Sequence, residues 1–141
     1  KRIEEFLKLA FITTGLVGVV MILLIIFTPN TLANIFLEDT NHKTKEIVLS
    51  FATFIWIAFL FDGFNLVISA YFTAIHKPLA SMIIAVSRSF IFPIFFIVTL
   101  PFFFDLNGIF MAIPMAEFMT FIIGIILFKK FSPEKIIYKE G

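Results

Sequence analysis

Five polar residues recur along one face of the otherwise apolar segment 59–78. At about 100° per residue, their spacing places them on one side of a helix. The five are Asp62, Asn65, Ser69, Thr73 and His76. A carboxylate and an amide can bind a cation, whereas hydroxyls commonly hydrogen-bond between membrane helices. The stripe is therefore either a hydrogen-bonded seam between packed helices or the lining of a water-filled cavity.

Two further charges lie deep in apolar segments. Arg88 and Glu117 are each ten residues from a turn, at Pro78 and Asn107 respectively, or roughly 15 Å along a helix. Together with Asp62 they share one depth on three helices. They form either one structural ion pair with a spare acid, or a proton or cation site whose charge state Arg88 tunes. We favour Glu117 as the partner of Arg88, because their helices form a hairpin.

The surroundings of these charges are a membrane. Hydrophobic residues make up 60% of the 141 residues and charged residues 15%, against roughly 45–50% and 25% in soluble domains. Each of four apolar runs has the ~20 residues that a membrane helix needs. We predict an all-α integral membrane protein whose single membrane domain, 1–141, has spans at about 6–27, 47–75, 79–104 and 109–128.

Lysine and arginine predict the orientation of these spans. The N-terminal flank carries three, the turn after the second span one, and the C-terminal tail four. The opposite side carries two, in a segment 31–46 that we expect to begin as an amphipathic helical turn and continue as a solvated loop. Eight against two predicts that both termini of this multi-pass protein face the cytoplasm, in an inner or plasma membrane.

Smaller residues and prolines suggest where helices pack and bend. Ala10, Thr14 and Gly18 form a ridge of small residues suited to close helix packing. Pro93 and Pro114 each remove a backbone donor from a span and permit a kink.

Several functions are disfavoured. Cysteine is absent, and no Walker A, HExxH or GxSxG sequence occurs, so we expect no enzyme and no thiolate site. The net charge of +1 indicates no nucleic-acid partner. His42 and His76 are expected at opposite membrane faces and cannot share a metal. We expect no cofactor, and no metal beyond Na⁺ at Asp62.

Three stretches carry a family resemblance. The sequences AFLFDGFNLVISAYFTAIHKP, SRSFIFPIFF and LNGIFMAIPMAEFMTFIIG resemble the last three helices of the MATE family of multidrug and toxin extrusion transporters, and FTPNTLANIF is similar to the end of its ninth helix. The resemblance covers essentially the whole chain. It implies helices nine to twelve of a twelve-helix, two-lobed transporter.

That resemblance implies a function. Family members export cationic amphipathic compounds in exchange for Na⁺ or H⁺, so the expected partners are small organic cations, the lipid bilayer and the remaining helices of the transporter. Asp62 and Asn65 match a cation-coupling pair of the tenth helix, with Asn in place of the usual Gln. Independently of the resemblance, we expect Arg88 and Glu117 to form a charge network. Ser69, Thr73 and Thr120 are the candidate cavity-lining residues, although for Ser69 and Thr73 we favour hydrogen-bonded packing between helices.

Two alternatives remain open. A flippase for a lipid-linked saccharide shares the fold, but it should line its cavity with several cationic residues to hold phosphates. A non-transporting membrane scaffold would use the same charges only to lock helices together.

Overall fold

The computed structural model describes residues 2–36 and 42–131, and all of the regular structure in these ranges is helical. Four segments are long and apolar enough to cross a membrane, as predicted. The elements, in chain order, are α1 (Arg2–Phe27), α2 (Pro29–Phe36), α3 (His42–Ala74), α4 (Pro78–Val86), η1 (Ser87–Ile91), α5 (Phe92–Thr99) and α6 (Pro101–Lys130). The segment α4–η1–α5 forms the third span.

The helix ends differ from the predicted span ends. The second span was expected to start at about Ile47, but α3 begins at His42, so the part of the expected loop from 42 to 46 is helical. Hydropathy marks where a segment is apolar, whereas Lys and Glu propagate a helix beyond the lipid. Residues 37–41 of that loop lie outside the described ranges. The expected amphipathic turn is the helix α2.

The third and fourth spans meet earlier than predicted. The third ends at Thr99 instead of 104, because Pro101 occupies the first turn of α6. Asp105 then interrupts the helix with φ 50° and ψ −131°, within the predicted turn. A Cβ on Gly108 would lie 2.5 Å from the carbonyl oxygen of Leu100, so this close return of the chain requires glycine.

The turn between α3 and α4 is a helix C-cap of the Schellman type. His76 has φ 56°, its N–H donates to the Thr73 carbonyl at 3.2 Å, and the Lys77 N–H donates to the Phe72 carbonyl at 2.9 Å. Pro78 then starts α4. The predicted tight HKP turn is thereby confirmed.

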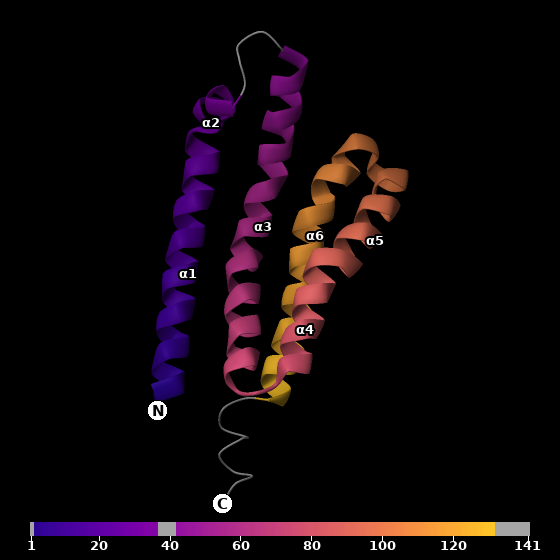
Figure 1. The fold of residues 1–141 in the computed structure, drawn as a ribbon. Coiled ribbons are helices and arrows are strands. Elements are labelled where there is room, and N and C mark those ends of the chain that lie inside the picture. The colour runs from indigo at the N-terminus through magenta and orange to yellow at the C-terminus, as the bar shows by residue number, and fades with distance from the viewer. Residues whose placement is uncertain (1, 37–41, 132–141) are drawn as a thin grey trace, which may run out of the picture.

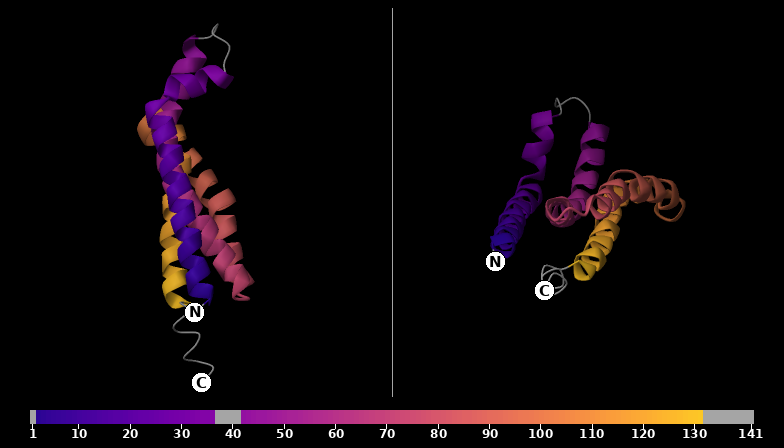
Figure 2. Two further views of the ribbon diagram at one scale, coloured as in Figure 1. Left: turned by 90° about the vertical axis from the view of Figure 1, so that its left-hand side faces the viewer. Right: turned by 60° about the horizontal axis from the view of Figure 1, so that its bottom comes forward.

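Helix α3 lies between α1 on one side and α6 with α4 on the other (Figures 1 and 2). It packs closely on α1 and on α6, and α5 packs on α6. In the most apolar part of each span, no residue of α1 is buried, whereas 39% of the residues of α6 are. The core of the described chain therefore lies around α6 and its contact with α3.

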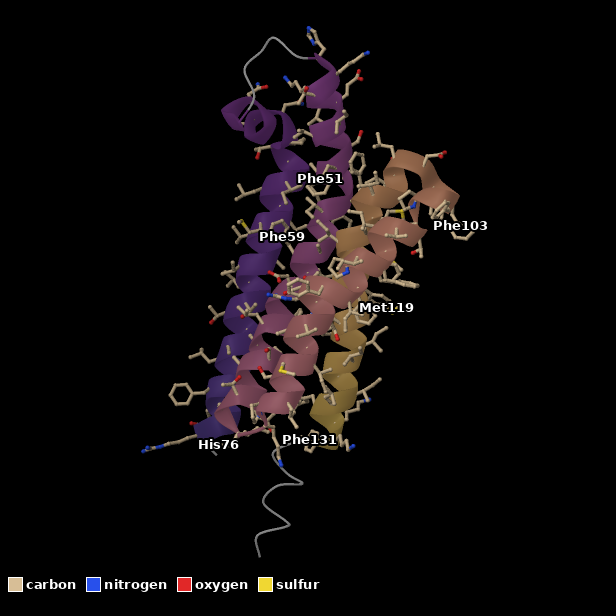
Figure 3. The ribbon with its side chains drawn as sticks, turned by 45° about the vertical axis from the view of Figure 1, so that its right-hand side comes forward. Phe51, Phe59, His76, Phe103, Met119 and Phe131 are labelled. Atoms are coloured by element: carbon tan, nitrogen blue, oxygen red, sulfur yellow. The ribbon has the colours of Figure 1, made fainter. Side chains whose placement is uncertain are left out.

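One end of the molecule is basic. The start of α1, the α3–α4 turn and the end of α6 lie together there (Figure 1). We call it the basic end, because it carries Arg2, Lys8, Lys77, Lys129 and Lys130. The α5–α6 turn lies toward the other end, and its Phe103 side chain points away from the helices (Figure 3).

Candidate functional site: a charged network between three spans

Asp62 of α3 and Arg88 of η1 form an ion pair between Oδ1 of the carboxylate and Nη1 of the guanidinium. The pair is asymmetric in its exposure. The Asp62 side chain is 49% exposed and the Arg88 side chain 27%. Asp62 is therefore held from one side by Arg88 and left open on the other.

Arg88 reaches this position from a π-helical turn. The Phe92 N–H donates to the carbonyl of Ser87, five residues back, instead of the α-helical four. Pro93 follows directly, and it supplies no N–H to Ser89 and crowds that carbonyl. The extra residue of the π-turn is a known way to accommodate such a break, and such turns are frequent at functional sites. The predicted irregularity at Pro93 is thus present, and Arg88 lies within it.

Glu117 of α6 is held mainly by Asn65 of α3. The Asn65 Nδ2 donates both to Oε2 of Glu117 at 2.8 Å and to its backbone carbonyl at 2.9 Å. Both acceptors require the NH₂ group of the amide, which fixes its orientation. Asn65 is fully buried and Glu117 nearly so. The Oδ1 of Asn65 has no hydrogen-bond partner within the described ranges.

These four residues form one network. Nε of Arg88 lies 4.0 Å from Oε1 of Glu117, at the limit of an ion pair. The expectation that Arg88 pairs chiefly with Glu117 is therefore wrong, because Asp62 is its closer partner. The family resemblance implied that Asp62 and Asn65 together bind the coupling cation, which stays a prediction. In the structure Asp62 contacts Arg88, Asn65 contacts Glu117, and Arg88 and Glu117 join the two contacts. We call Asp62, Arg88, Glu117 and Asn65 the charged network.

The rest of the polar stripe forms a hydroxyl cluster between α3 and α4. The Oγ atoms of Ser69 and Ser81 lie 2.9 Å apart, and Thr73 Oγ1 donates to Ser81 Oγ at 2.9 Å. The stripe thus faces neighbouring helices, as expected. These contacts correspond to the hydrogen-bonded seam, and a cavity lined by Ser69 and Thr73 stays a prediction.

Thr120 occupies a packed position in α6. It is fully buried, and its Oγ1 donates to the Ala116 carbonyl at 2.8 Å. In the structure its hydroxyl is hydrogen-bonded within its own helix, and a role in lining a transport cavity stays a prediction.

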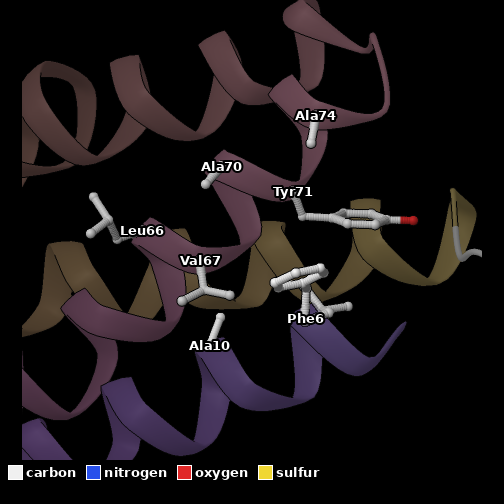
Figure 4. A pocket seen from close by; sticks show the side chains of 8 residues that line it. Phe6, Ala10, Leu66, Val67, Ala70, Tyr71 and Ala74 are labelled. Atoms are coloured by element: carbon white, nitrogen blue, oxygen red, sulfur yellow. The ribbon is translucent and has the colours of Figure 1, made fainter. Parts of the chain in front are cut away.

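A groove between α1 and α3 contains none of the predicted site residues. Its volume is about 400 Å³, and its walls are apolar. Phe6 and Ala10 of α1 face Leu66, Val67 and Ala70 of α3 across it (Figure 4). This groove offers apolar surface without the charges that ion coupling needs.

The possible metal ligands of the described residues lie apart from one another. In the described ranges, no three His, Cys, Asp or Glu side chains cluster closely enough to hold a metal ion. Asp62 and Glu117 are the acids of the charged network, and Arg88 lies between them. Na⁺ binding at Asp62 therefore stays a prediction.

Sequence reasoning missed three contacts. It did not find Ser81 as the partner of Ser69, nor the bond from Asn65 to Glu117. It also missed Gly63, whose added Cβ would overlap the Cγ2 methyl of Thr14. The small-residue ridge around Thr14 was a signal for the last contact, because such a ridge marks a face where two helix backbones approach closely.

Comparison with known proteins gives one match. The sequence model of the MatE family matches residues 1–99, which include α1 to α5 and three residues of the charged network. Helix α6 and its Glu117 lie outside the matched range. No curated protein and no solved structure matches the chain. Because the match takes in 99 of the 141 residues, the chain belongs to the MatE family.

Proposed function

We propose that this chain provides the cation-coupling site of an antiporter that exports cationic amphipathic compounds in exchange for Na⁺ or H⁺. Membership of the MatE family implies efflux of drugs or cations by antiport in general, in a multi-pass membrane protein that is not an enzyme. The finer assignment, with Asp62 as the coupling carboxylate, is the part proposed here.

One observation carries the proposal: Asp62 is a half-exposed carboxylate inside a span. It lies 12 residues from Ala74 at the end of α3, or about 18 Å along the helix. A charge at such depth is costly and usually functional. The open side of Asp62 leaves room for a cation.

Arg88 supplies a means of exchange. A cation that binds Asp62 competes with the guanidinium for the same carboxylate. Displaced from Asp62, Arg88 has a second acid nearby, because Glu117 Oε1 is 4.0 Å from its Nε. The π-turn that carries Arg88 lacks a regular α-helical hydrogen-bond pattern, and such turns are frequent at functional sites. Cation binding and Arg88 position are thereby coupled.

The test uses the full natural chain in proteoliposomes loaded with a fluorescent cationic dye. With an imposed Na⁺ or H⁺ gradient, Asp62→Asn should reduce dye export to the level of dye-loaded vesicles without protein. The asparagine keeps the shape of the side chain but removes its charge. Asp62→Glu should keep part of the activity. Running the two gradients separately identifies the coupling ion.

A matched control makes the same chemical change elsewhere. Asp105→Asn removes an acid from the α5–α6 turn, outside the charged network, and Asn, like Asp, occurs at positive φ in turns. This variant should export normally. Normal export by a well-folded Asp62→Asn protein would contradict the proposal and favour a purely structural role for the network, as in the scaffold alternative.

A further inference from the structure

A second cleft opens at the basic end of the molecule, away from the charged network. It has a volume of about 450 Å³ and lies between the α3–α4 turn, α4 and the end of α6. His76 and Phe131 mark this region at the foot of Figure 3. Leu79 and Ile83 of α4 face Leu127 of α6 across an apolar interior. The cleft is therefore apolar inside and lies where the spans meet the headgroup region.

Two ammonium groups lie at this cleft, each beside the same aromatic ring. Nζ of Lys77 lies 5.5 Å, and Nζ of Lys130 5.7 Å, from the centroid of the Phe131 ring. Within residues 2–36 and 42–131, neither lysine pairs with a carboxylate. No acid is among the residues that line the cleft. Both positive charges therefore lie at the edge of the apolar interior, where each of them would attract an anion.

Two helix ends of opposite polarity lie at the cleft. The N-terminus of α4, beginning at Pro78, directs partial positive charge toward it. Pro78 has no N–H, and the N–H groups of Ala80 and Ser81 donate to the Lys77 carbonyl at 3.1 and 3.3 Å. The end of α6 carries the opposite partial charge, so the attraction for an anion comes from the two lysines.

We propose that this cleft binds an anionic phospholipid of the surrounding leaflet. The phosphate lies between Lys77 and Lys130, and an acyl chain lies along Ile83 and Leu127. A molecule with a negative head and an apolar tail matches the position of the charges above an apolar interior, and basic pockets between spans are known to bind such headgroups. A lipid held there links the α3–α4 turn to the end of α6.

The proposal is tested by native mass spectrometry of the full natural chain, reconstituted in vesicles of equal parts phosphatidylglycerol and phosphatidylcholine and then released into detergent. The protein should retain phosphatidylglycerol in preference to phosphatidylcholine. In the double variant Lys77→Gln with Lys130→Gln, this preference should disappear. The double variant Lys77→Arg with Lys130→Arg should keep it, because the positive charges remain.

A matched control removes the same net charge from the same end. Lys8→Gln with Lys129→Gln changes two exposed lysines that do not line the cleft, and it should retain phosphatidylglycerol like the unchanged protein. Equal retention of the two lipids by the unchanged protein would overturn the proposal. So would an equal loss in both glutamine pairs, because that result would mean that only the overall surface charge attracts the lipid.

Discussion

At the scale of single residues, Asn65 and Arg88 approach different oxygens of Glu117. The amide of Asn65 donates to Oε2 and to the backbone carbonyl, whereas Nε of Arg88 lies 4.0 Å from Oε1. Asp62, one turn earlier on α3, is the closer partner of Arg88. The expectation that hairpin neighbours pair first was wrong because it did not consider an acid of a third helix, α3.

This assignment predicts unequal coupling energies. Removing one partner of a fully buried ion pair costs roughly 3–5 kcal/mol, and the cost should be smaller here because Asp62 is half exposed. In a double-mutant cycle, Arg88→Gln should couple more strongly to Asp62→Asn than to Glu117→Gln. The measurement is the thermal unfolding of the purified full chain in detergent.

The same cycle run with Asp105→Asn serves as its control. That residue lies outside the charged network, so its effect should add to that of Arg88→Gln within about 0.5 kcal/mol. A larger coupling to Glu117 than to Asp62 would show that the 4.0 Å contact, not the Asp62 ion pair, dominates.

At the scale of helices, glycine determines how α1 and α3 meet. Gly63, next to Asp62, faces Thr14, and Gly18 lies near the carbonyl of Phe59. The Thr14 hydroxyl donates to the Ala10 carbonyl at 2.7 Å, which holds its methyl group toward α3. The helix that carries Asp62 is thus positioned against α1 by the residue beside it.

A larger residue at Gly63 should lower the stability of the protein, and a second substitution at Thr14 should restore part of it. Gly63→Ala places a Cβ into the Thr14 methyl, and overpacking of this kind typically costs 1–3 kcal/mol. Adding Thr14→Ser removes that methyl and keeps the hydroxyl, so the nearest remaining contact is 3.6 Å, to the Cβ of residue 14. The melting temperature should fall in the single variant and partly recover in the double variant.

Gly15→Ala is the matched control on α1. A Cβ there meets nothing closer than 3.9 Å, so helix propensity should leave stability unchanged or slightly raised. If Gly63→Ala were equally harmless, α1 would not pack on α3 as described.

The elements themselves were largely predictable. Apolar length predicted four spans because lipid forces every backbone group to pair within its own helix. The sequence HKP predicted a turn because proline cannot continue the preceding helix, whereas the positive φ of His76 was found only in the structure. The π-turn at Ser87–Ile91 was not predictable in detail. Pro93 predicts an irregularity in the helix, but whether the helix kinks or widens depends on the packing of Arg88 and its neighbours.

At the scale of the whole molecule, the sequence predicted how deep the charged residues lie in the membrane, but not which of them are in contact. Asp62, Arg88 and Glu117 were placed at one level by counting residues. Which of them touch depends on helix rotation, which is not encoded in a count. The uncovered apolar face of α1, with exposed Leu9, Leu16 and Leu23, must lie against lipid or other helices.

The basic end also predicts how the molecule lies in the membrane. Among the described residues, five Lys and Arg side chains lie at the basic end, against Lys43 and Lys45 at the start of α3, so the basic end should face the cytoplasm. In a cysteine-free full chain, Glu46→Cys should react with a membrane-impermeant thiol reagent in intact cells. Lys129→Cys should react only after the cells are permeabilised, and this step also controls for its accessibility. The reverse labelling would invert the orientation, and the proposed phospholipid cleft would then face the outer leaflet.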